Sequence, residues 1–224
     1  MINTNWDNSQ IQYYQDTIRR KIPGYDLIYE QMLAIIETNF IPQDILIVGA
    51  GGGQELYVLG KKYPETAYTA LDPSCRMLEL AKQRVDNMLL KVDWQETTLD
   101  KFHCEKEYDI VTCHLMLHFL KEEKAAILNQ ISQRVKAGGL LFISAIVEEE
   151  KKDSTLPFWL QHMRLCNVPA PDWEHFATSF DKTTHPLSAS LLYQVLKDNG
   201  FEVILPYFKS YAIEAYVAIK GRGA

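Results

Sequence analysis

An apolar run that breaks into glycines is the feature that most constrains how this chain can fold. Residues 45–48 are all apolar and lead into the glycine-rich residues 49–53, and a second apolar run ends downstream at Asp72. Glycine lets a backbone approach a ligand closely, and an acid at the tip of the next strand can accept hydrogen bonds from ribose hydroxyls. The pattern therefore predicts a strand–turn–helix–strand unit that binds a nucleotide.

The spacing of the glycines leaves two kinds of nucleotide site to compare. A dinucleotide site has the pattern G-x-G-x-x-G, and Gln54 stands where its third glycine belongs, which weakens an oxidoreductase. The chain instead carries G-x-G-x-G at Gly49, Gly51 and Gly53. A turn without a ligand is the remaining alternative, but three alternating glycines exceed what one turn requires.

The rest of the chain alternates between strand-like and helix-like segments, which predicts a parallel sheet with helices on both faces. We expect an α/β fold with a doubly wound, mostly parallel, seven-stranded sheet and a C-terminal antiparallel hairpin. The expected strands are 44–49, 66–72, 88–92, 108–113, 139–147, 201–208 and 211–220, and the expected helices are 54–63, 74–86, 121–136 and 187–199. Two short helices should meet at Pro23 and Gly24, and Pro206 should lie in an edge strand because it cannot donate to a ladder.

We expect one domain in four parts. They are a helical cap (1–40), a cofactor-binding core (41–147), an insertion covering the substrate (148–186), and the last helix with the hairpin (187–224). Residues 154–186 lack a clear pattern and are expected to be irregular and rich in aromatics.

Bulk properties exclude several classes of protein. The net charge of −6 argues against broad capture of nucleic acid, so no DNA partner is expected. No apolar run approaches the length of a membrane span. Four scattered cysteines suit a reducing compartment, so we expect a cytoplasmic protein.

Five landmarks in register carry a resemblance. The glycine turn is followed by Asp72, then by Asp93 and Trp94, then by the apolar run that ends at His114, and finally by residues 137–141. In this order they resemble the class I S-adenosylmethionine-dependent methyltransferases. Residues 18–25 further resemble the N-terminal segment of a subgroup that includes the carboxy-S-adenosylmethionine synthases.

The resemblance implies S-adenosylmethionine as cofactor and a set of site residues. It places the methionine part of the cofactor on the glycine turn, the ribose on Asp72, the adenine near Asp93, and the cofactor carboxylate near the tyrosine after Pro-Gly. The implied cofactor-binding residues are Tyr25, Gly49, Ala50, Gly51, Gly53, Asp72, Pro73, Asp93, Trp94 and His114. Asp72 could instead be the N-cap of the helix that begins at Pro73 and Ser74, and Asp93 a turn acid.

One position departs from the family pattern. Many members carry an acid two residues before the first glycine, where it helps to hold the amino group of the cofactor; this chain has Ile47 there. Another group must supply that contact. Arg19 or Arg20 could neutralise the cofactor carboxylate, although surface arginines on a solvated helix face are the simpler interpretation.

Methyl transfer requires alignment first, and a base only if the acceptor arrives protonated. His114 is the candidate catalytic residue, because it ends a strand at the edge where such sheets bind ligands. A metal site from Cys113, His114 and His118 lacks a fourth ligand, so no metal is expected. His162, His175 and His185 are weaker candidates, in a segment whose aromatics either line a pocket or complete the core.

The sequence therefore predicts a methyltransferase acting on a small or medium-sized acceptor, and allows a homodimer. One alternative is a carboxy-S-adenosylmethionine synthase-like enzyme of tRNA modification. Val195 weakens it, because the synthases carry an arginine there to hold the added carboxylate. The other is a non-catalytic protein that binds the cofactor.

Overall fold

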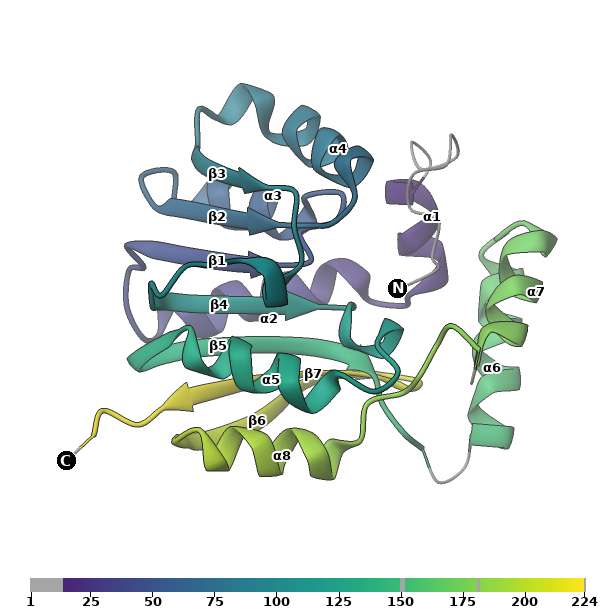
Figure 1. Ribbon diagram of the computed structural model, residues 1–224. Coiled ribbons are helices and arrows are strands. Elements are labelled where there is room, and N and C mark those ends of the chain that lie inside the picture. Colours follow the sequence, from purple (N-terminus) through teal and green to yellow (C-terminus); the bar gives the residue numbers. More distant parts are fainter. Residues whose placement is uncertain (1–13, 150–151, 181, 224) are drawn as a thin grey trace.

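The computed structural model describes residues 14–149, 152–180 and 182–223. Within them, seven strands form one sheet in the order β3-β2-β1-β4-β5-β7-β6 (Figure 1). The first five strands run parallel, and β7 runs antiparallel to both of its neighbours. The strands are β1 Asp44–Val48, β2 Ala67–Leu71, β3 Lys91–Gln95, β4 Tyr108–His114, β5 Val135–Ile146, β6 Phe201–Ser210 and β7 Ile213–Lys220. The predicted fold class and the C-terminal hairpin are confirmed, with Pro206 in the edge strand β6.

Helices cover both faces of the sheet because alternate strand residues point to opposite sides. Ile45 and Ile47 of β1 pack in one core cluster with residues of α2 (Tyr25–Glu37), α3 (Gln54–Lys62) and α4 (Cys75–Val85). Leu46 and Val48 pack in a second cluster with residues of α5 (Lys124–Gln133) and α8 (Ala189–Asp198). Both faces of the central strands are therefore buried, as a doubly wound sheet requires.

Three helices lie beyond the carboxyl ends of the parallel strands, and we call them the cap (Figure 1). They are α1 Tyr14–Lys21, α6 Lys152–Leu165 and α7 Ala170–Ser179. Trp159 of α6 donates its indole N–H to the Lys21 carbonyl at 2.7 Å, and the Lys21 ammonium lies 3.0 Å from an Asp172 carboxylate oxygen. The two contacts join the N-terminal helices to the segment between β5 and α8.

The expectation that residues 154–186 are irregular is wrong for α6 and α7. The prolines in this segment look like loop punctuation in the sequence, but Pro169 is the N-cap of α7 and Pro171 lies in its first turn. Proline is tolerated at a helix start, because the missing N–H would have no intrahelical partner there. The break between α1 and α2 is confirmed, with Gly24 in the left-handed region at the start of α2.

The expected boundaries of the third strand are also wrong. A short 3-10 turn, Asp86–Met88, extends α4, so β3 begins only at Lys91 and ends at Gln95. Asp93 therefore lies inside the strand and does not follow it. Within the described residues, no helix is both long and apolar enough to cross a membrane.

Candidate cofactor site

The glycine turn connects β1 to α3, and all three of its alternating glycines adopt left-handed backbone conformations. The φ angles are 77° at Gly49, 51° at Gly51 and 76° at Gly53. A Cβ atom at position 53 would lie 2.8 Å from the Cα of Ala81 in α4, and one at position 49 would lie 3.1 Å from Cγ of Met116. A larger residue would therefore be strained at either position; at position 53 it would clash with α4, and at position 49 it would crowd the Met116 side chain.

Asp72 follows β2 and binds the glycine turn directly. One carboxylate oxygen accepts a hydrogen bond from the Gly51 amide at 2.8 Å, and the other accepts one from the Ser74 amide at 2.9 Å. The N-cap interpretation is wrong, because Ser74 is the N-cap of α4 and accepts from the Met77 amide. The two bonds fix the carboxylate between the glycine turn and the start of α4.

The candidate adenine residues lie on β3. Asp93 is exposed, pairs in register with Thr69 and accepts a hydrogen bond from the Gln95 side chain at 2.7 Å. The Gln95 carbonyl, in turn, accepts from the Asp72 amide. The first acid beyond the end of β3 is Glu96, whose charge is the main cause of a raised pKa at Cys75, so it lies near the turn that follows Asp72.

Trp94 and Pro73 are less closely tied to the turn. Trp94 is half-buried beside Ala70 of β2, and the Lys82 ammonium lies 5.7 Å from the centre of its ring. Pro73 is exposed between Asp72 and the N-cap of α4.

The two candidate arginines are already engaged by protein groups. Arg19 donates two hydrogen bonds to Asp26 and a third to the side chain of Gln54, the first residue of α3. Arg20 donates to the Asn167 carbonyl at 2.9 Å. The two arginines join the N-terminal helices to the glycine turn and to the segment between α6 and α7. They are therefore not simply solvated on a helix face, and their hydrogen bonds to protein groups do not leave them free for a cofactor carboxylate.

Tyr25 is buried at the start of α2. Its ring packs against that of Tyr29, and the two hydroxyls lie 3.4 Å apart. Burial is the main cause that raises the pKa of Tyr25 to about 12, so its hydroxyl stays a hydrogen-bond donor at neutral pH.

His114 ends β4 at the same edge of the sheet. Its Nδ1 lies 2.9 Å from the Ser144 hydroxyl, and its ring packs edge-on against Tyr29. Nε2 is buried and has no hydrogen-bond partner among the described residues. Burial lowers the pKa of His114 to about 3, so the imidazole is neutral at ordinary pH.

The neighbours of His114 point elsewhere. Cys113 packs in the core cluster on the α5 and α8 side, and Nδ1 of His118 accepts from the Ile146 amide. In the part of the chain that the structure describes, no three His, Cys, Asp or Glu side chains are arranged to hold a metal ion.

A buried polar cluster beside the turn escaped the sequence analysis. Glu55, in the first turn of α3, is only 4% exposed, and burial raises the pKa of its carboxyl to about 8. Its Oε1, the Thr112 hydroxyl and the Tyr207 hydroxyl are all buried without a hydrogen-bond partner among the described residues. Buried polar atoms are costly when unsatisfied. These atoms therefore offer hydrogen-bonding capacity to a polar ligand.

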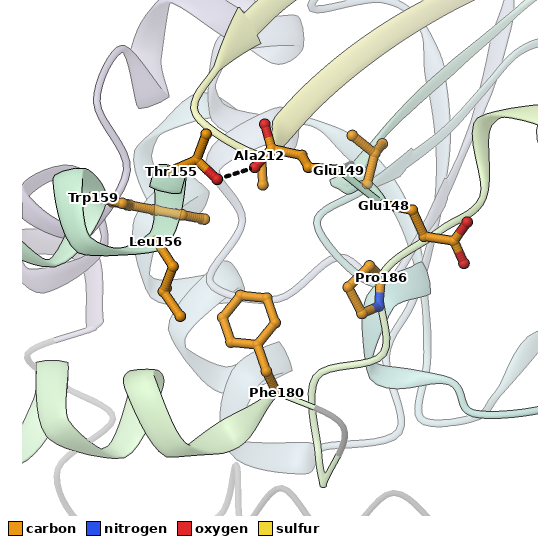
Figure 2. A pocket seen from close by; sticks show the side chains of 9 residues that line it. Glu148, Glu149, Thr155, Leu156, Trp159, Phe180, Pro186 and Ala212 are labelled. Atoms are coloured by element: carbon orange, nitrogen blue, oxygen red, sulfur yellow. Dashed lines mark hydrogen bonds between the residues drawn. The ribbon is translucent and has the colours of Figure 1, made fainter. Parts of the chain in front are cut away.

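The aromatic segment of the cap serves both expected purposes. Trp159 is 2% exposed, stacks on Tyr211 and packs edge-on against Phe176, as a core residue does. It also lines a hollow of about 190 Å³ at the end of β5, opposite Phe180 and the acidic residues Glu148 and Glu149 (Figure 2).

The weaker histidine candidates lie apart from one another. His162 of α6 contacts the Cys166 sulfur at 3.4 Å, His175 is exposed on α7, and the His185 amide donates to the His118 carbonyl. Their different surroundings do not bring them together into one site.

Comparison with known proteins supports a methyltransferase. A family model described as a methyltransferase domain matches residues 45–139, which include the glycine turn and β4. The carboxy-S-adenosyl-L-methionine synthase of Campylobacter lari is 23% identical over 96% of this chain and 94% of its own. Together with the fold, these matches support a class I S-adenosylmethionine-dependent methyltransferase that resembles the carboxy-S-adenosyl-L-methionine synthases.

Other relatives of this methyltransferase carry different names. The malonyl-[acyl-carrier protein] O-methyltransferase of Priestia megaterium is 31% identical, but the match covers only 50% of this chain and 41% of that one. Among solved structures, the N-methyltransferase NodS of Bradyrhizobium japonicum with S-adenosyl-L-homocysteine has a TM-score of 0.63 at 14% identity. That match covers 92% of this chain and 97% of NodS.

An O-methyltransferase family protein from Burkholderia thailandensis has a TM-score of 0.66 at 15% identity. The match covers 96% of this methyltransferase but only 58% of that chain. The solved structures at this level of identity support the fold, and the relatives support the family, while their different activities leave the acceptor of this methyltransferase to be proposed.

Proposed function

We propose that the edge formed by the glycine turn, Asp72 and His114 binds S-adenosylmethionine and directs its methyl group to a small or medium-sized acceptor. The observation that supports this most is the hydrogen bond from the Gly51 amide to Asp72, which fixes a buried carboxylate against a turn of left-handed glycines. When bound, the cofactor supplies an electrophilic methyl group, and the protein has mainly to align it and exclude water.

The proposed contacts of the chain follow the strand ends in order. The backbone of Gly49, Ala50, Gly51 and Gly53 faces the methionine part of the cofactor, Asp72 and Pro73 face the ribose, and Asp93 and Trp94 remain the predicted adenine residues. Because β3 ends beyond Asp93, we add Glu96 to the adenine end of the site. The Tyr25 hydroxyl is proposed to donate to the cofactor carboxylate.

His114 is proposed to contact the acceptor as a neutral imidazole. A histidine whose pKa is lowered to about 3 is a poor base at neutral pH, but its free Nε2 can hydrogen-bond a polar group of the acceptor. The bond between Nδ1 and Ser144 and the packing on Tyr29 hold the ring in one orientation. We therefore assign His114 to orientation of the acceptor.

The acceptor is proposed to lie between the sheet edge and the cap. The hollow beside Trp159 and Phe180 opens at the end of β5, next to the strand that carries His114 (Figure 2). We also keep three predictions from the sequence. The chain is divided into four parts with boundaries at residues 40, 147 and 186, it can form a homodimer, and it is located in the cytoplasm.

The synthase alternative is not favoured. Val195 is buried among apolar side chains of α8 and its neighbours, so this position offers no cation for an added carboxylate. Mass spectrometry of the nucleoside that copurifies with the protein distinguishes the two cofactors, because the carboxylated form is heavier.

The proposal is tested by comparing Asp72→Asn with the matched variant Asp198→Asn. Removing the charge of Asp72 should weaken binding of S-adenosylhomocysteine by roughly 10- to 150-fold, the range for hydrogen bonds to charged groups. The Asp198 variant should bind like wild type, because that side chain is exposed at the end of α8 and belongs to no part of the proposed site. Equal affinity of the Asp72 variant and wild type would contradict the proposed site.

A further inference from the structure

The amino group of the cofactor lacks its usual acid in this chain. The family position two residues before the first glycine is Ile47, which is fully buried among apolar side chains. An isoleucine there cannot neutralise an ammonium group. A different residue must lie close to this position if the amino group is to be bound.

The register of the sheet shows which side chains surround position 47. Ile47 of β1 pairs with Thr112 of β4, and neighbours in a parallel register point to the same face. That face is covered by α2 and α3. Glu55 reaches this face from the first turn of α3. Its carboxyl lies near the Thr112 hydroxyl, which lowers the pKa of Glu55 against the larger effect of burial. A carboxylate thus lies beside position 47, but it comes from the helix.

Glu55 has spare binding capacity. Its side chain is almost wholly buried, Oε1 has no hydrogen-bond partner, and no ion pair among the described residues includes it. Glu55 also raises the pKa of Tyr207, after the larger effect of burial, so the unpartnered Tyr207 hydroxyl is close by. A buried carboxyl is retained at a cost to stability unless a cation or donor completes it.

We propose that Glu55 binds the amino group of S-adenosylmethionine, in the place of the acid that Ile47 lacks, with the Tyr207 hydroxyl as a second acceptor. The inference rests on the proposed function. Because burial raises the pKa of Glu55 to about 8, the free protein holds a proton there at neutral pH. An incoming ammonium group favours the carboxylate, so the proton leaves to the solvent as the cofactor binds.

Two ligands separate this contact from the rest of the site. S-adenosylhomocysteine carries the amino-acid part, whereas 5′-methylthioadenosine has the same adenosine and sulfur without it. Glu55→Gln keeps the size of the side chain and removes the charge, and Glu30→Gln on the exposed face of α2 is the matched control. Each variant is titrated with both ligands by calorimetry, in two buffers of different ionisation enthalpy, after thermal unfolding confirms that it is folded.

Glu55→Gln should weaken S-adenosylhomocysteine at least about tenfold and change 5′-methylthioadenosine by less than about twofold. Wild type and Glu30→Gln should release close to one proton with S-adenosylhomocysteine near neutral pH, and Glu55→Gln should release none. Unchanged affinity of Glu55→Gln, or equal weakening of both ligands, would overturn the assignment of Glu55 and leave the proposed function standing. If wild type bound neither ligand, the proposed function itself would fail.

Discussion

The stability of the free protein should depend on Glu55 in a way that changes with pH. Burial raises the pKa of this carboxyl from 4.5 to about 8. The folded protein keeps this proton up to a higher pH than the unfolded chain does. The resulting stabilisation is complete below the pKa of the unfolded chain, 4.5, and is lost as the pH rises through the pKa of the folded protein, about 8. Between about pH 5 and pH 8 the loss amounts to about 3 kcal/mol, because each unit of pKa difference is worth about 1.4 kcal/mol.

Glu55→Gln removes the titration and keeps the shape, so it should remove this loss. We expect the difference in unfolding free energy between Glu55→Gln and wild type to grow in favour of the variant by about 3 kcal/mol from about pH 5 to pH 8. Urea denaturation of the ligand-free proteins at both pH values measures it, with Glu30→Gln as the exposed control. Other titrating groups are common to the proteins and cancel.

Saturating S-adenosylhomocysteine should shift the difference back toward wild type by about 1.4 kcal/mol for each tenfold difference in affinity, because the ligand binds wild type more tightly. A change of less than about 1 kcal/mol between the two pH values would refute the reasoning, since it would mean that the Glu55 carboxyl titrates normally in the folded protein.

Two further predictions concern the turn and the edge of the sheet. Gly53→Ala should destabilise the protein by about 3 kcal/mol, measured by urea denaturation, because the strain of a left-handed backbone adds to the clash with Ala81. Gly200 is also left-handed, but a Cβ there would have nothing within 4 Å, so Gly200→Ala should cost only about 1 kcal/mol. Equal losses would show that the contact with α4 is unimportant. Burial lowers the pKa of His118 from 6.5 to about 3, so the free energy of unfolding should fall as the pH drops below about 6.5. His118→Gln removes this titration and should make the loss at about pH 5 smaller by about 2 kcal/mol. An identical pH dependence of the two proteins in urea titrations would contradict this.

The fold class, a doubly wound sheet with a C-terminal hairpin, could be predicted because its cues are local. Apolar runs, glycines and an acid at a strand end lie next to one another in the sequence, and parallel alternation allows few topologies. The boundary of β3 could not be predicted, because the extra 3-10 turn after α4 leaves no clear mark in the sequence. Helix α7 was missed because Pro169 and Pro171 suit both a loop and a helix start, and α6 was missed because it contains Pro157, which normally disfavours a helix interior.

The sequence predicted only those parts of the cofactor site whose residues form a recognisable local pattern. The glycine turn and Asp72 are consecutive landmarks, whereas Glu55 looks like an ordinary acid in the first turn of a helix. Its burial against Thr112 depends on the pairing of β1 with β4, which brings together residues far apart in sequence. The missing acid at Ile47 was the available clue, because it implied that another acid should be sought nearby.

A crystal structure of the protein with S-adenosylhomocysteine would test the central claim most directly. It should show the ribose hydroxyls at hydrogen-bond distance from the Asp72 carboxylate, and the amino group of the ligand on Glu55 beside position 47. A nucleoside bound elsewhere on the protein, or a ribose turned away from Asp72, would contradict the account.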